Sequence, residues 1–253
     1  MMKILLTNDD GIFSEGLAQC YEALSSIGQV WVFAPDRERS ASSHSLTLDL
    51  PLRATEIRNN WWAISGTPTD CVNLGVLHFM KGNWPDLVVS GINFGINLGD
   101  DVTYSGTVSA TFEASILGIA GVAISQEMGI EVDLKRTAAL SARIILFLKS
   151  KKLLENSTIF NINFPKGTPK GISFCHLGKR HYEESVVENT DPRGKRYFWI
   201  GGAPTHTEPE KGTDFEALLK ENISITPLHL DLTDYEKLKI CKEIEEELKG
   251  VME

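Results

Sequence analysis

Two adjacent carboxylates follow the first apolar segment of the chain. Asp9 and Asp10 come directly after residues 4–6, an Ile-Leu-Leu run that is typical of a short buried strand. Neighbouring carboxylates repel each other, and a hard divalent cation with oxygen ligands relieves that repulsion. Ligands of open α/β sheets bind outside the carboxyl ends of the strands, where these residues are expected. The alternative is a solvated turn built on Asp10 and Gly11.

Polar loops follow two further predicted strands. The loop after residues 30–34 is rich in serine and contains Ser40 and His44, and the loop after residues 87–89 begins with Ser-Gly-Ile-Asn and contains Asn93. The carboxyl ends of parallel strands meet at one edge of a sheet, so we expect these loops to converge on Asp9 and Asp10. Their carboxylate, hydroxyl and carboxamide oxygens suit Mg²⁺, Mn²⁺ or Ca²⁺.

The loop from residue 90 to residue 107 is long and rich in glycine, and it ends in Ser105-Gly106-Thr107 before a helical pattern. Glycine lets backbone amides approach an anion, and the amides that begin a helix attract phosphate. The alternative is a surface loop with Ser105 or Thr107 as a helix N-cap. His44 is a candidate acid or base, and the alternative for it is ordinary polar surface.

These loops need a scaffold of alternating strands and helices. Strands are predicted at 4–6, 30–34, 61–64, 87–89, 122–124 and 159–164, and helices at 15–24, after 67–68, at 107–117 and at 132–149. Such alternation predicts βαβ units and a parallel sheet, which is an α/β fold.

The pattern changes after about residue 171. Residues 176–205 are polar, and two short apolar strands flank the turn Asp191-Pro192-Arg193-Gly194, which predicts a β-hairpin arm. Exposed aromatic residues on such an arm favour packing against another subunit. Residues 234–253 are predicted to form a charged amphipathic helix.

Composition narrows the classes of function. The chain has 253 residues and a net charge of −9, which disfavours binding to a nucleic-acid polymer. Four scattered cysteines indicate free thiols in a reducing compartment. We see no signal peptide and no apolar run of membrane-spanning length, so we expect a cytoplasmic protein without a membrane partner. The motifs of P-loop NTPases, dinucleotide-binding domains, α/β-hydrolases and H-E-x-x-H metalloproteases are absent.

Several ordered motifs resemble those of the SurE family of survival-protein phosphatases. They are Thr7-Asn8-Asp9-Asp10-Gly11, Ala34-Pro35-Asp36-Arg37-Glu38-Arg39-Ser40, Ser65-Gly66-Thr67-Pro68-Thr69-Asp70-Cys71, Ser90-Gly91-Ile92-Asn93, Tyr104-Ser105-Gly106-Thr107-Val108-Ser109-Ala110, Leu177-Gly178-Lys179-Arg180, Asp191-Pro192-Arg193-Gly194, Gly212-Thr213-Asp214 and Ser224-Ile225-Thr226-Pro227-Leu228. The motifs run through nearly the whole chain, and each is uncommon by itself.

The resemblance implies a fold and an assembly. It implies a Rossmann-like three-layer sandwich with a mostly parallel sheet, a C-terminal β-hairpin arm and a C-terminal helix. Residues 1–170 would form the catalytic core, and residues 171–253 would form the arm, a return segment and the helix, within the same domain or as a swapped appendage. The expected assembly is a homodimer or homotetramer.

The resemblance also implies an activity and its residues. It implies a phosphomonoesterase, a 5′/3′-nucleotidase that hydrolyses nucleoside 5′- and 3′-monophosphates by attack of metal-activated water. One divalent cation per subunit, Mg²⁺ or Mn²⁺, would be bound by Asp9, Asp10, Ser40 and Asn93. The phosphate group would be bound by Asn97, Ser105, Gly106 and Thr107. Asn8 would orient the water or a ligating aspartate.

Two other functions remain open at this stage. The same site would serve a phosphatase that acts on polyphosphate, either as its main reaction or as an exopolyphosphatase side activity, because only the leaving-group pocket differs. A protein that senses a metal or a nucleotide without turnover would also need these ligands. An activity assay separates the sensor from the two enzymes.

Overall fold

The first half of the chain alternates strands and helices, as its hydrophobic pattern predicts. The computed structural model describes residues 1–129, 132–179, 185–201 and 209–245. All six strands predicted from the sequence form. In the structure they are β1 (Met2–Thr7), β2 (Gly28–Pro35), β4 (Trp61–Ile64), β5 (Leu87–Phe94), β6 (Ala120–Gln126) and β7 (Ile159–Phe164). The predicted helices are α1 (Glu15–Ser25), α2 (Pro68–Leu74), α3 (Gly106–Ile116) and α4 (Leu134–Ser150).

These strands belong to one mixed sheet of nine, ordered β3-β4-β2-β1-β5-β6-β7-β11-β8. Six neighbouring pairs are parallel, from β4 through to β7 and between β11 and β8. The antiparallel pairs join β3 to β4 and β7 to β11. The carboxyl ends of β1, β2 and β5 therefore lie side by side, which confirms the mostly parallel sheet and the convergence of their loops.

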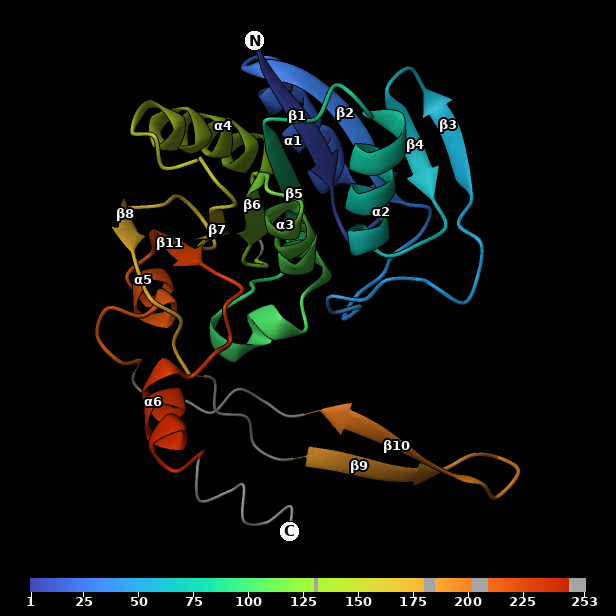
Figure 1. Cartoon of the computed structure of the whole chain (residues 1–253). Helices are drawn as coiled ribbons and strands as arrows, with labels where there is room; N and C mark the ends of the chain where they lie inside the picture. Colours follow the sequence, from blue (N-terminus) through green and yellow to red (C-terminus); the bar gives the residue numbers. More distant parts are fainter. Residues whose placement is uncertain (130–131, 180–184, 202–208, 246–253) are drawn as a thin grey trace.

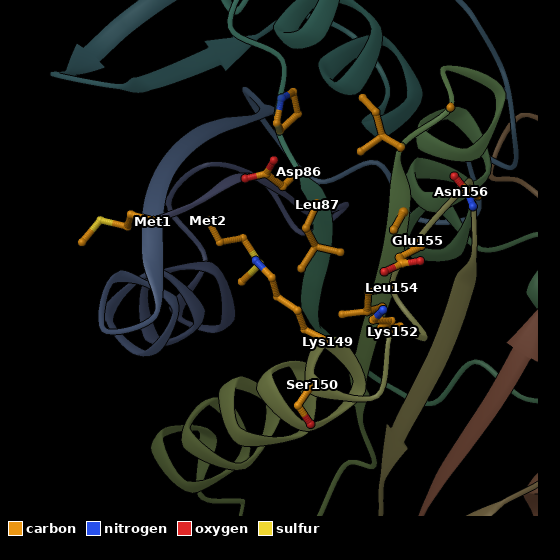
Figure 2. A pocket seen from close by; sticks show the side chains of 14 residues that line it. Met1, Met2, Asp86, Leu87, Lys149, Ser150, Lys152, Leu154, Glu155 and Asn156 are labelled. Carbon is orange, nitrogen blue, oxygen red and sulfur yellow. The ribbon is translucent and has the colours of Figure 1, made fainter.

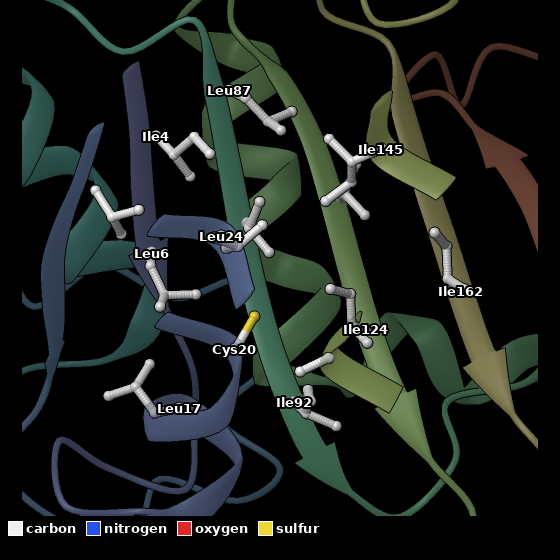
Figure 3. Packing of buried hydrophobic residues seen from close by; sticks show 14 of the residues in the cluster. Ile4, Leu6, Leu17, Cys20, Leu24, Leu87, Ile92, Ile124, Ile145 and Ile162 are labelled. Carbon is white, nitrogen blue, oxygen red and sulfur yellow. The ribbon is translucent and has the colours of Figure 1, made fainter. Parts of the chain in front are cut away.

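Helices cover both faces of the sheet, and this gives three layers (Figure 1). One buried cluster lies between the sheet and helices α1 and α4, and Leu17, Cys20 and Ile145 belong to it (Figure 3). A second cluster lies between the opposite face and helices α2 and α3, and it includes Phe33, Val72 and Ala110. The central strands are apolar on both faces, as parallel strands between two helical layers must be.

N-cap side chains determine where three of the helices begin. Ser14 and Ser105 accept hydrogen bonds from Leu17 and Val108 as the N-caps of α1 and α3. The N-cap of α2 is Thr67, which forms a capping box with Asp70. These polar residues therefore fix where each helix begins relative to the edge of the sheet.

Three features go beyond the sequence pattern. The loop after β2 contains an edge strand, β3 (Ala54–Arg58), whose five residues are all exposed and so lack apolar alternation. A π-helical turn, η1 (Gly75–Phe79), follows α2, and a 3₁₀ helix, η2 (Gly99–Thr103), interrupts the glycine-rich loop. The strand β3 pairs with β4, which follows it closely in the chain, whereas the backbone N–H that begins η2 is bonded to Asp214, far along the chain.

The C-terminal part returns to the sheet. Its elements are β8 (Gly171–Phe174), α5 (Asp214–Leu219), β11 (Asn222–Leu228) and α6 (Tyr235–Glu243). The hairpin is formed by β9 (Ser185–Thr190) and β10 (Arg196–Gly201), which project away from the sheet (Figure 1). The division predicted between residues 170 and 171 stays a prediction, while β8 and β11 extend the sheet across it.

The sequence also leads to predictions about the state of the cysteines and about membrane-spanning segments. All four cysteines are free. Within the described ranges, no helix has the length and apolar character needed to cross a bilayer.

The close approach of α1 to β5 brings the two sides of the predicted site together. A Cβ atom on Gly16 would lie 2.1 Å from the carbonyl oxygen of Ile92. We expect Gly16→Ala to lower the free energy of unfolding by about 2 kcal/mol, because overpacking outweighs the gain in helix propensity. Denaturant unfolding measures this effect.

Ala18→Gly on the exposed face of the same helix is the control. It is expected to cost about 1 kcal/mol through helix propensity alone. A Gly16→Ala protein as stable as the parent chain would contradict the predicted steric constraint.

Candidate metal and phosphate site

Asp9 is a buried carboxylate at the carboxyl end of β1, and its residue is 6% exposed. The hydroxyl group of Thr107 donates a hydrogen bond to Asp9 Oδ1 at 2.6 Å. Burial raises the pKa of Asp9 above its usual value, although hydrogen bonds from Thr107 oppose this. The structure therefore joins a predicted metal ligand to a predicted phosphate-binding residue.

Asp10 lies next to Asp9 and carries the second charge. The backbone N–H of Phe94 points at Asp10 Oδ2 over 3.4 Å, which joins the end of β1 to the end of β5. Burial, followed by the negative charge of Asp9, raises the pKa of Asp10 to about 6. Such a pair of carboxylates favours a cation between or beside them, because positive charge offsets both the burial and the repulsion.

The two other predicted metal ligands lie on the neighbouring loops. Asn93 is half-buried, and its amide nitrogen donates to the carbonyl oxygen of Gly95 at 2.9 Å, so Oδ1 is the atom that a cation would take. Ser40 is exposed, and its hydroxyl group donates to Glu38 at 2.6 Å. The backbone of this serine-rich loop reaches Asp9 through the N–H of Arg39, which donates to the carbonyl oxygen of Asp9 at 2.7 Å.

Asn8 shapes the turn that presents the two carboxylates. Its amide nitrogen donates to the carbonyl oxygen of Gly11 at 3.0 Å and to Ser14 Oγ at 2.7 Å. Its Oδ1 is buried and has no hydrogen-bond partner among the described residues. Asn8 thus connects the carboxylate turn to the N-cap of α1, and its catalytic role stays a prediction.

Helix α3 begins directly against Asp9. A Cβ atom on Gly106 would lie 2.6 Å from Ser42 Oγ and 3.1 Å from Asp9 Oδ2. Ser105 is the N-cap, as the structural alternative predicted, and Thr107 bonds to Asp9. Phosphate binding by this segment stays a prediction. The partial positive charge at the start of a helix suits an anion such as a phosphate group.

Asn97 is held in place by hydrogen bonds to residues of β6 and β7. Its amide nitrogen donates to Ser125 Oγ at 2.8 Å, while its backbone bonds to the side chains of Asn161 and Asn163. Contact between Asn97 and a phosphate group stays a prediction. Sequence reasoning did not identify the two supporting asparagines, although they break the apolar run of β7 at alternate positions.

The structure also joins three residues that sequence reasoning left apart. Glu113 lies on α3 with 4% exposure, and its carboxylate contacts His44 Nε2 at 3.0 Å and Asn73 Nδ2 at 2.6 Å. Only tertiary structure brings α2, α3 and the serine-rich loop to one point. His44 is therefore tied to a buried carboxylate rather than being free polar surface.

The residues present suit a hard cation. No cluster of three or more His, Cys, Asp or Glu side chains with metal-binding geometry occurs in the described part of the chain. The four predicted metal ligands do not form such a cluster, because only two of them are carboxylates and the other two are serine and asparagine oxygens. Burial raises the pKa values of both aspartates, so their charged forms are costly here and a cation would offset that cost.

A groove of about 860 Å³ lies at the opposite edge of the sheet (Figure 2). It is lined by Met1, Met2, Asp86, Leu87, Lys149 and Lys152, among others. None of the predicted site residues is among the residues that line it. The chemistry predicted from the sequence is thus concentrated at the other edge, where β1, β2 and β5 end.

Comparison with known proteins identifies the family. The family model described as survival protein SurE matches residues 4–184. This chain belongs to the SurE family. The resemblance inferred from its motifs is confirmed.

Individual relatives match this chain over almost its whole length. The 5′-nucleotidase SurE of Geotalea uraniireducens is 48% identical over 95% of this chain and 98% of its own length. The protein of the same name from Myxococcus xanthus is 43% identical over 93% of this chain and 90% of its own length. The crystal structure of the SurE protein from Aquifex aeolicus has a TM-score of 0.86 and 42% identity, and the match covers 96% of this chain and 99% of that one. This likeness confirms the predicted fold class.

The raised pKa of Asp10 leads to a pH-dependent stability. Its folded pKa of about 6 exceeds the ordinary value of 3.8, so unfolding releases a proton between these values and the folded state loses stability as pH rises through them. Without a metal, we expect Asp10→Asn to raise the melting temperature at pH 7 by about 2–4 °C, or about 1 kcal/mol after solvent screening. Thermal unfolding in EDTA measures this.

The pH series is the sharper part of that experiment. The advantage of Asp10→Asn must shrink as pH falls toward 4, because the parent carboxyl group then becomes protonated. Asp49→Asn, at an exposed position, controls for a simple change of net charge. An Asp10→Asn protein that is less stable at pH 7, or whose advantage grows in acid, would contradict the assignment.

Proposed function

We propose that this SurE family member is a metal-dependent phosphomonoesterase that hydrolyses nucleoside monophosphates to nucleoside and phosphate. The observation that carries the proposal is the adjacent Asp9–Asp10 pair against the N-terminus of α3, in which Asp9 is buried and Asp10 is half-buried. Relatives named 5′-nucleotidase SurE, up to 48% identical over nearly the full length, support the choice of substrate class.

We assign one divalent cation, Mg²⁺ or Mn²⁺, to each subunit. Asp9, Asp10, Ser40 and Asn93 supply four oxygen ligands, the donor chemistry that such cations prefer. When bound, the cation would offset negative charge on the phosphoryl group and lower the pKa of a water molecule. Two raised carboxylate pKa values support positive charge at this point.

The residues around the cation position the substrate. The backbone amides at the start of α3 would hold phosphoryl oxygens, as would the hydroxyl group of Ser105, with Asn97 donating from the side of β6. Thr107 fixes the orientation of Asp9, and Asn8 fixes the turn that carries both aspartates. We propose direct attack by water, because both aspartates would be committed to the cation and neither would then be free to form a phosphoenzyme.

The same geometry extends the proposal to further phosphate esters. The assigned residues would contact the phosphoryl group rather than the sugar, so we propose 3′-monophosphates as substrates beside 5′-monophosphates. Polyphosphate would present the same terminal group, which supports an exopolyphosphatase side activity. A substrate panel that includes these compounds ranks them directly.

The first experiment is phosphate release from nucleoside 5′- and 3′-monophosphates with Mg²⁺ or Mn²⁺. We expect EDTA to abolish turnover and Asp9→Asn to lower kcat by about 100-fold or more, the scale on which single charge-stabilising groups act. Asp49→Asn, which removes an exposed carboxylate elsewhere, should match the parent protein. Turnover that resists EDTA, or a phosphorylated aspartate trapped during the reaction, would refute the mechanism.

We propose that the hairpin joins subunits into a homodimer or homotetramer. Phe198, Trp199 and Ile200 on β10 are 56%, 66% and 92% exposed, which is a large apolar surface for one strand. We expect Trp199→Ser with Ile200→Ser to lower the molar mass seen by light scattering after size-exclusion chromatography. Lys195→Ser, beside the turn of the hairpin, is the matched control, and an unchanged mass in the double variant would disprove this role.

We place the protein in the cytoplasm. Four free cysteines fit a reducing compartment. Fractionation of cells that express the untagged chain tests this location.

A further inference from the structure

Another buried carboxylate, that of Glu113, lies on α3 two turns beyond Gly106. Its two oxygens are divided between two elements: Asn73 of α2 donates to Oε1 at 2.6 Å, and His44 Nε2 lies 3.0 Å from Oε2. The His44 ring also packs edge-on against Phe112 at 6.0 Å. A buried carboxylate is retained only when it is hydrogen-bonded, so this junction is a built contact between the loop and α3.

The loop at residues 40–45 needs such an anchor. Ala41 and Ser43 have φ angles of 53° and 55°, a left-handed conformation that is unfavourable for residues with side chains. Two hydrogen bonds from Ser43 hold the loop on the segment before α3, one from its N–H to Tyr104 O at 3.1 Å and one from its hydroxyl group to Thr103 O at 2.7 Å. Unfavourable backbone persists only where surrounding contacts impose it.

The anchored loop places one hydroxyl group beside the proposed phosphate site. Ser42 Oγ is buried and has no hydrogen-bond partner among the described residues. It faces the same side of Gly106 as Asp9 Oδ2, as the two short distances to a Cβ there show. An unpaired buried hydroxyl group is costly, and a phosphoryl oxygen at the start of α3 would supply its missing partner.

His44 itself lies away from that point. Glu113 follows Gly106 by seven residues, and seven residues of α-helix span about 10 Å along the axis. A histidine bound at Glu113 is therefore displaced along α3 from the amides that begin the helix.

We propose that Glu113 and His44 are positioning residues that hold the Ser40–Ser45 loop over the first turn of α3. Through this loop they place the Ser42 hydroxyl group as an additional donor to the phosphoryl group of the substrate. The inference rests on the proposed function and deepens it, because it concerns how the same site binds phosphate.

The test compares His44→Ala, His44→Gln and Ser42→Ala in the full chain. We expect His44→Ala and Ser42→Ala to raise KM and the Kd for inorganic phosphate by about fivefold, the scale of one hydrogen bond, with kcat changed by less than about twofold. His44→Gln should restore both values, because the amide nitrogen of glutamine takes the position of Nε2. Glu113→Gln should resemble His44→Ala if it remains folded.

A stability control separates positioning from general loosening. Ile145→Val, in the core between α4 and the sheet, lowers stability far from the loop and should leave KM unchanged. Unchanged KM and phosphate Kd in His44→Ala, loss of kcat alone, failure of His44→Gln to restore binding, or an equal rise in KM for Ile145→Val would each overturn the inference.

The proposed function fails in a different way. A folded parent protein that releases no phosphate from any monophosphate refutes the nucleotidase. If that protein still binds inorganic phosphate, the Kd values of the same variants still decide whether Glu113 and His44 position the loop. If it binds none, both proposals are overturned.

Discussion

The adjacent carboxylates of Asp9, which is buried, and Asp10, which is half-buried, are the constraint on which the rest of this site depends. Asp9 is almost fully buried and Asp10 lies beside it, so the folded chain concentrates negative charge where three strands end. This arrangement is unfavourable by itself, and the surrounding hydrogen bonds only reduce its cost. A divalent cation would offset this negative charge.

The positions of the neighbouring elements follow from that constraint. The hydroxyl group of Thr107 reaches Asp9 because α3 begins with a glycine, whose missing Cβ leaves room for Asp9 and Ser42. Similarly, α1 packs closely on β5 only because Gly16 has no side chain. Small residues at two helix starts thus allow the three polar loops to meet without steric conflict.

Much of this architecture could be predicted from the sequence. The apolar runs, the N-cap candidate Ser105 and the Thr67-Pro68 start indicated the order and type of the elements in the first half. The edge strand β3 escaped prediction because an exposed strand has no buried face and so no alternating pattern. The pairing of β11 between β7 and β8 also escaped, because pairing depends on contacts between segments far apart in the chain.

The sequence by itself determined the chemistry of this protein: adjacent aspartates after a strand, a glycine-rich loop that ends in a helix cap, and motifs shared with the SurE family. Tertiary structure alone decided which oxygens are buried, that the Thr107 hydroxyl group donates a hydrogen bond to Asp9, and that His44 contacts Glu113. The physical reason is that residue types and local spacing encode donors and turns. Burial, pKa and contact between distant loops arise only when the sheet and its helices are packed.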